Sequence, residues 1–168
     1  SAGDDSVTVS TNDIEAISGG DGIDDVTLTD ASGNTVDLAG VEVIAGSAGD
    51  DILTVTDDTS VTVDGGDGSD TLTGNVGDDT LLGGTGSDTL IGGGGADFVD
   101  GGQGSDLLEL DGSAGVTAEG GDGTDTVVLV GETNEASLSG VEVVTGSAGD
   151  DSVTVSTNDI ASVSGGSG

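Results

Sequence analysis

Aliphatic residues in this chain stand at single positions between polar ones. Segments such as 61–63 (Val-Thr-Val) and 41–43 (Val-Glu-Val) alternate apolar and polar residues, which predicts short strands with one buried face. Between Gly68 and Leu90, leucines return every nine positions. A short fixed period predicts a solenoid, in which each repeat buries its apolar face by stacking on its neighbours. Helix signals are absent, so we expect an all-β fold.

A motif rich in glycine and aspartate fills the residues between these aliphatic positions. The pattern G-x-x-G-x-D-x-U-x, in which U is aliphatic, begins at Gly19, Gly46, Gly65, Gly74, Gly83, Gly92, Gly101, Gly120 and Gly146. A further copy at Ser1 lacks the first glycine, and another is cut off at 165–168. The sixth position is always aspartate, namely Asp5, Asp24, Asp51, Asp70, Asp79, Asp88, Asp97, Asp106, Asp125 and Asp151. We therefore expect one kind of turn, repeated along the chain.

The charge of the chain needs a partner from outside. The sequence has 34 acidic residues and no Lys, Arg or His, so its formal net charge is −34. Without basic residues, binding to nucleic acid or to anionic lipid lacks its main electrostatic term. The absence of cysteine excludes disulfides and thiolate metal sites. No apolar run approaches the ~20 residues of a membrane helix, and no signal peptide is visible. A dissolved cation is the expected counterion.

The nonapeptides resemble the RTX, or haemolysin-type, calcium-binding repeats G-G-x-G-x-D-x-U-x. Six copies have both leading glycines, whereas those at 46 and 146 read GSAGDD and the one at 74 reads GNVGDD. The resemblance implies a parallel β-roll, a β-helix solenoid with calcium bound between turns of neighbouring coils. Glycine suits such tight turns, and calcium prefers carboxylate and carbonyl oxygens. We expect one continuous roll of about nine coils over 1–168, with its densest nonapeptide run at 65–109.

The resemblance implies calcium ligands of two kinds. Carboxylates come from all ten sixth-position aspartates, and turn oxygens come from Gly65, Gly83, Gly92, Gly101 and Gly120. Whether the extra aspartates Asp4, Asp50, Asp78 and Asp150 add ligand charge or face solvent stays open.

The spacing of the copies predicts which turns stack. Copies about eighteen residues apart share a side if nine residues form half a coil. One side then stacks the turns at 46, 65, 83, 101 and 120, and the other stacks 1 with 19, 74 with 92 and 146 with 165. These pairs predict about seven calcium sites. The segments LAGVEVIA and LSGVEVVT, which lack the motif, are expected to form strands of the same roll.

Residue types argue against an enzyme. Serine and threonine have no histidine or lysine to activate them, and sugar stacking on aromatic rings could use only Phe98.

The segment SAGDDSVTVSTNDI occurs at 1–14 and again at 147–160, which favours a longer repeat array.

Two functions fit these observations. One is an extracellular rod, as in the stalk of an adhesin, a surface fibre or an S-layer protein, which folds on calcium and associates with itself or continues into further repeats. The other is the calcium-triggered folding and secretion module of an RTX toxin or hydrolase. A calcium-dependent ice or mineral surface is disfavoured, because Thr71, Thr80 and Thr89 are expected to alternate sides.

Overall fold

The computed structural model describes residues 2–156 and 160–166. Within them the chain forms eighteen strands and one short 3₁₀ turn, η1 (Gly112–Ala114), with no α-helix. The odd-numbered strands are β1 (Ser6–Val9), β3 (Asp25–Leu28), β5 (Val43–Ala45), β7 (Thr62–Asp67), β9 (Thr80–Thr85), β11 (Phe98–Gly104), β13 (Val116–Gly123), β15 (Glu135–Ser139) and β17 (Ser152–Val155). The even-numbered strands are β2 (Ala16–Ser18), β4 (Thr35–Ala39), β6 (Ile52–Val55), β8 (Thr71–Thr73), β10 (Thr89–Gly94), β12 (Leu107–Asp111), β14 (Thr126–Val130), β16 (Val143–Thr145) and β18 (Ser162–Ser164).

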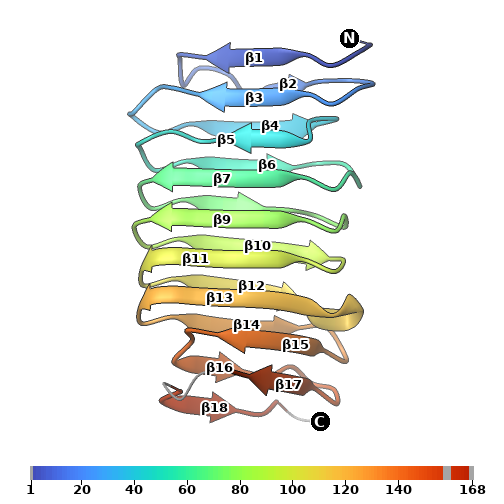
Figure 1. Cartoon of the computed structure of the whole chain (residues 1–168), viewed down its shortest axis with the longest axis vertical. Helices are drawn as coiled ribbons and strands as arrows, with labels where there is room; N and C mark the ends of the chain where they lie inside the picture. Colours follow the sequence, from blue (N-terminus) through green and yellow to red (C-terminus); the bar gives the residue numbers. More distant parts are fainter. Residues whose placement is uncertain (1, 157–159, 167–168) are drawn as a thin grey trace.

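The strands form two parallel sheets that face each other. All odd strands pair in sequence order in one sheet, and all even strands pair in order in the other. Figure 1 shows the two layers, whose strands run in opposite directions while the chain advances from one end of the stack to the other. The expected all-β parallel solenoid is therefore confirmed. The path from β1 to β17 comprises eight full turns, so the expected nine coils slightly overstate the number.

Turns line the two long edges between the sheets. Edge A holds the segments that lead from an odd strand to the next even strand, the first residues of which still belong to the odd strand in four cases: 10–15, 29–34, 46–51, 65–70, 83–88, 101–106, 120–125 and 140–142. Edge B holds the turns that precede odd strands: 2–5, 19–24, 40–42, 56–61, 74–79, 92–97, 112–115, 131–134 and 146–151. The predicted stacking of the turns at 46, 65, 83, 101 and 120 is confirmed by the pairing of Leu53, Leu72, Leu90, Leu108 and Val127 in one sheet. In the other sheet, Val7 pairs with Val26 and Leu81 with Val99, as predicted for 1 with 19 and for 74 with 92. The copy at 165–168, predicted to stack on the turn at 146, lies partly outside the described residues.

The core between the sheets is a thin double row of aliphatic side chains. It contains only Val, Leu, Ile and Ala, and it includes most eighth-position residues of the motif. Val7 departs from this pattern with 43 % of its side chain exposed, because it lies on the first coil and only one neighbouring coil covers it. So narrow a core buries little area per residue, which makes the coils depend on interactions at their edges.

Candidate metal sites along the turn edges

Every motif aspartate except Asp5, which lies in the first coil, is hydrogen-bonded to the coil before it. The Oδ1 atom of Asp88 accepts the backbone N–H of Asp70 at 2.8 Å, and Oδ1 of Asp106 accepts that of Asp88 at 2.8 Å. On edge B, Oδ1 of Asp97 accepts the N–H of Asp79 at 3.0 Å. One carboxylate oxygen per coil therefore joins a continuous ladder along edge A, whereas the bonds along edge B form shorter runs.

In seven of these carboxylates the other oxygen is buried and has no partner. Among the described residues, the buried Oδ2 atoms without a hydrogen bond belong to Asp24, Asp70, Asp79, Asp88, Asp97, Asp106 and Asp125. These side chains are at most 3 % exposed. A buried carboxylate that is neither paired nor fully hydrogen-bonded costs several kcal/mol. Since the sequence has no basic side chain, a proton or a bound cation must compensate for this cost.

The first glycine of the turn leaves space beside that oxygen. A Cβ added to Gly65 would lie within 3.0 Å of both Asp70 Oδ2 and the carbonyl oxygen of Gly83 in the next coil. The same cradle of an aspartate Oδ2 and a next-coil carbonyl recurs at Gly74, Gly83 and Gly101. The carbonyls of Gly92, Gly101 and Gly120, like that of Gly83, face such a cradle, and the Gly65 carbonyl faces Gly46. All five glycines proposed as turn ligands thus point an oxygen at a neighbouring turn.

This donor set suits calcium. In the described part of the chain, no three acidic side chains converge on one point, so a cation must also draw on backbone oxygens. Carboxylate and carbonyl oxygens alone fit a hard cation that takes six to eight oxygen ligands. The assignment of individual aspartates and glycines as calcium ligands stays a prediction.

Burial perturbs the carboxylates that carry the unpartnered oxygens. It raises the pKa of Asp70 and of Asp79 to about 6, against the effect of a backbone N–H that donates to each. The neighbouring charges of Asp88 and Asp97, respectively, add to the increase. Burial is likewise the main cause of the raised pKa of Asp88, Asp97, Asp106 and Asp125. These carboxylates bind a proton more readily than usual when no cation is present.

The two GSAGDD turns are built differently. Ser47 donates its backbone N–H to Asp51 Oδ2 at 2.7 Å, and its hydroxyl lies 3.0 Å from the same oxygen. Asn34 donates its backbone N–H at 2.6 Å and its side-chain amide at 2.7 Å to Asp51 Oδ1. Both oxygens of Asp51 are therefore satisfied within the protein. The sequence pattern ranks Asp51 with the other ligands, but its carboxylate lacks the unpartnered oxygen that marks them.

Asp151 repeats this arrangement at the other end of the chain. Its Oδ2 accepts the N–H of Ser147 at 2.9 Å, and its Oδ1 accepts the side-chain amide of Asn134 at 2.7 Å. The hydrogen bond from Asn134 is the main cause of the lowered pKa of Asp151. Residues Asn34, Asn134, Ser47 and Ser147 were not predicted to matter; the only signal for them was the serine that replaces the second glycine in GSAGDD.

The remaining predicted positions lie at the first coil or on the surface. Asp5 is half-buried, and its backbone N–H donates to Asp24 Oδ1 at 2.8 Å. The extra aspartates are exposed, and three of them accept a backbone N–H of the next coil: Asp4 from Ile23, Asp50 from Ser69 and Asp78 from Ala96. Each of these bonds links two neighbouring coils at the surface, on edge B for Asp4 and Asp78 and on edge A for Asp50.

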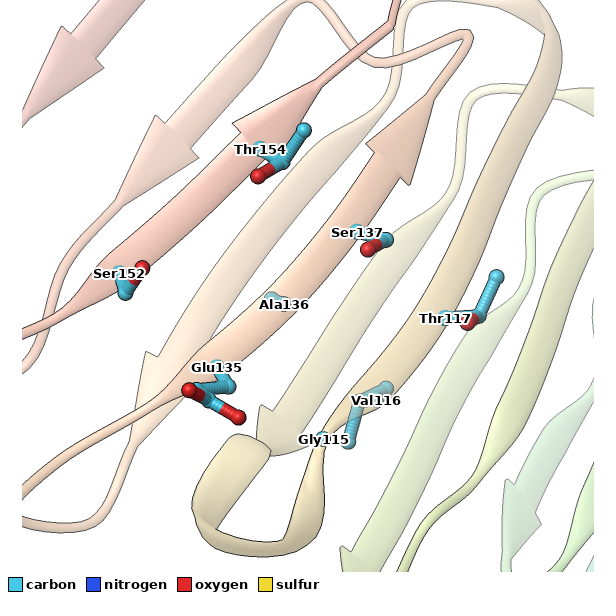
Figure 2. Close-up of a pocket in the computed structure, with 8 residues that line it drawn as sticks. All are labelled: Gly115, Val116, Thr117, Glu135, Ala136, Ser137, Ser152 and Thr154. Atoms are coloured by element: carbon cyan, nitrogen blue, oxygen red, sulfur yellow. The ribbon is translucent and has the colours of Figure 1, made fainter.

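A groove on the outer face of the odd sheet offers different chemistry. It encloses about 240 Å³ beside β13, β15 and β17. Figure 2 shows Thr117, Ser137 and Thr154 on successive strands along it, with Glu135 at the start of β15. Its polar side chains are hydroxyls and this one carboxylate.

In the described residues no helix has the length and apolar character needed to cross a membrane.

Comparison with known proteins agrees with the repeat geometry. No curated protein and no solved structure matches the chain. The family described as RTX calcium-binding nonapeptide repeat matches in four copies, at residues 38–59, 62–90, 73–108 and 138–160. The matched residues include turns on both edges and make up more than half of the sequence. The chain therefore belongs to the RTX calcium-binding nonapeptide repeat family.

Proposed function

We propose that this chain is a calcium-dependent extracellular rod, a structural segment of a repetitive secreted surface protein that folds and stiffens when calcium binds. The observation that carries the proposal is the row of buried, unpartnered aspartate oxygens in a chain without any basic side chain. Calcium would satisfy these oxygens and cross-link successive coils through the Asp and Gly oxygens of both turns. Binding free energy then contributes directly to folding.

Charge repulsion explains why folding depends on the ion. At a formal charge of −34 the chain repels itself, and the thin aliphatic core offers little to oppose that repulsion. Extracellular calcium modules typically have Kd values of ~10⁻⁴–10⁻³ M. Such affinity keeps the chain unfolded in the cytosol and folded outside the cell. This behaviour agrees with secretion, for which an unfolded chain is required until it has left the cell.

The unbroken stacking of strands in both sheets favours a rod over a folding module. Two parallel sheets run through the described chain, and the segment at 1–14 returns at 147–160. A structural element that repeats in this way extends in one dimension. We therefore propose that the protein is not an enzyme and that it continues into, or associates with, further repeats. The alternative is the calcium-triggered secretion module of an RTX toxin or hydrolase, and the coding sequence after Gly168 distinguishes the two.

Circular dichroism with and without EGTA tests the proposal. We expect β-structure in millimolar calcium, its loss after chelation and its return when calcium is restored. Magnesium at the same concentration serves as the control, because it prefers a rigid octahedral site with several waters. Unchanged β-structure after complete chelation at neutral pH contradicts the proposal.

A further inference from the structure

The two GVEV segments, at 40–43 and 140–143, form turns that are shorter than the nonapeptide turns. Each begins with a glycine in the left-handed region, Gly40 at φ 56° and Gly140 at φ 58°. The valine that follows is buried, with 1 % of Val41 and none of Val141 exposed. The glutamate that follows this buried valine is the last residue of the turn and lies directly beside the preceding coil.

Each glutamate is held against an aspartate of that coil. The backbone N–H groups of Glu42 and Val43 donate to the carbonyl of Asp24 at 3.1 and 3.2 Å, and Glu42 Oε2 accepts the N–H of Asp24 at 2.8 Å. On the other edge, Glu142 Oε2 accepts the N–H of Asp125 at 2.7 Å. The glutamate oxygen thus takes the place that the next-coil aspartate Oδ1 takes elsewhere in the ladder.

The surroundings match a nonapeptide cradle part for part. Between the turns at 65 and 83, the unpartnered Asp70 Oδ2 and the Gly83 carbonyl meet at the Cβ position of Gly65, and Asp88 supplies the carboxylate of the next coil. At the first GVEV segment, the corresponding groups are Asp24 Oδ2, the Gly40 carbonyl and Glu42. At the second, they are Asp125 Oδ2, the Gly140 carbonyl and Glu142.

The buried aspartates point to a ligand at these two places. Asp24 is 2 % exposed and Asp125 is fully buried, and the Oδ2 of each is directed into the cradle without a partner. Asp97 provides a contrast, since its Oδ2 is also unpartnered but no atom of the next coil lies within 3.6 Å of the Cβ position of Gly92. Where nonapeptide turns stop stacking, as after the turn at 92, the cradle lacks groups from the next coil. The GVEV segments supply such groups after the turns at 19 and 120.

We infer that Glu42 and Glu142 close two calcium sites outside the nonapeptide pattern, one between the turns at 19 and 40 and one between those at 120 and 140. The inference rests on the proposed calcium-dependent folding. It assigns a role to the GVEV segment, in which glycine makes the turn, the first valine anchors it and the glutamate binds the cation.

Calcium stoichiometry of the full chain tests the inference. Bound calcium is measured by equilibrium dialysis and atomic emission, with isothermal titration calorimetry for affinity, on the wild type and on Glu42→Gln, Glu142→Gln and the double variant. Glutamine keeps an oxygen that can accept the aspartate N–H but removes the charge. Glu135→Gln is the matched control, since Glu135 is exposed at the groove in Figure 2.

We expect each single variant to bind about one calcium ion fewer, the double variant about two fewer, and the control to match the wild type. Circular dichroism in saturating calcium should show that the rest of the roll remains folded. Wild-type stoichiometry in the double variant overturns the inference, and so does a global loss of calcium and β-structure in either single variant, because the sites are local. Absence of calcium binding in the wild type would instead refute the proposed function.

Discussion

The residue at the second position of a nonapeptide turn separates aspartates whose Oδ2 atom has a partner from those whose Oδ2 atom has none. Glycines at this position, such as Gly66 and Gly84, have φ near 100°, and the aspartates of their turns keep an unpartnered Oδ2. Asn75 takes the same conformation at φ 86°, and the Oδ2 of Asp79 is unpartnered too. Serine does not adopt it and donates its N–H to the aspartate instead. A single substitution thus separates two classes of turn.

This distinction predicts different effects of two aspartate substitutions. Asp88→Asn should lower the bound calcium by about two ions, because Asp88 faces the cradles at Gly65 and Gly83. Asp51→Asn should instead lower the free energy of unfolding by about 1–3 kcal/mol through its lost hydrogen bonds, with a smaller change in calcium. Dialysis and thermal unfolding measure the two quantities. Equal calcium losses in both variants would argue against two classes.

The cradle glycines should tolerate no side chain. In Gly83→Ala the new Cβ would lie 2.5 Å from both Asp88 Oδ2 and the Gly101 carbonyl, in the space proposed for calcium. We expect weaker calcium binding and a lower melting temperature in calcium. Gly94→Ala is the control in the same run, because its Cβ would meet nothing closer than Val76 Cγ1 at 3.9 Å. If calorimetry gave both variants wild-type affinity, the cradle would not be the binding site.

At the scale of the strand and its turn, the nine-residue period was enough to predict the coil. Leu72, Leu81 and Leu90 lie in the core on alternating sheets, as their spacing indicates. The period could not reveal what happens where it breaks. Spacings of 17 to 18 residues link Asn34 to Asp51 and Asp24 to Glu42, but their roles depend on which turn conformation the intervening residues adopt. Those roles became visible only in three dimensions.

The asparagines end the ladders without a cation. Asn34 occupies the position of a motif aspartate on edge A, and its amide donates to Asp51 Oδ1 and to Ser47 Oγ at 3.1 Å. Asn34→Asp removes these donors and places two carboxylates side by side. We expect it to lower the free energy of unfolding in saturating calcium by about 1–3 kcal/mol.

Asn12→Asp provides the comparison for this change. Asn12 is exposed and its side-chain amide donates to Ser32 Oγ at 3.1 Å, so the same change in charge should have little effect there. Chemical denaturation followed by circular dichroism measures both variants. A stability of Asn34→Asp equal to that of Asn12→Asp would show that the asparagine amide does not cap the ladder.

At the scale of the whole molecule, we expect calcium and protons to compete for the same buried oxygens. The raised pKa values of Asp70 and Asp79, about 6, and the raised values at four further aspartates mean that the calcium-free roll binds protons more tightly than the unfolded chain does. Protonation therefore stabilises the calcium-free roll. This contribution is complete below the unfolded pKa of ~3.9 and is lost as the pH rises through about 6.

The response to pH should consequently reverse with calcium. In EGTA, acidification from about pH 7.5 to about pH 5 should increase β-structure and the melting temperature, because protons neutralise the buried carboxylates that repel one another. In limiting calcium the same acidification should lower the melting temperature, since each proton that binds a carboxylate removes negative charge that holds the ion. Circular dichroism melts at both conditions provide the measurement. A melting temperature that falls on acidification in EGTA would mean that these carboxylates are not buried in the calcium-free roll, and the coupling between ion binding and folding would need another source.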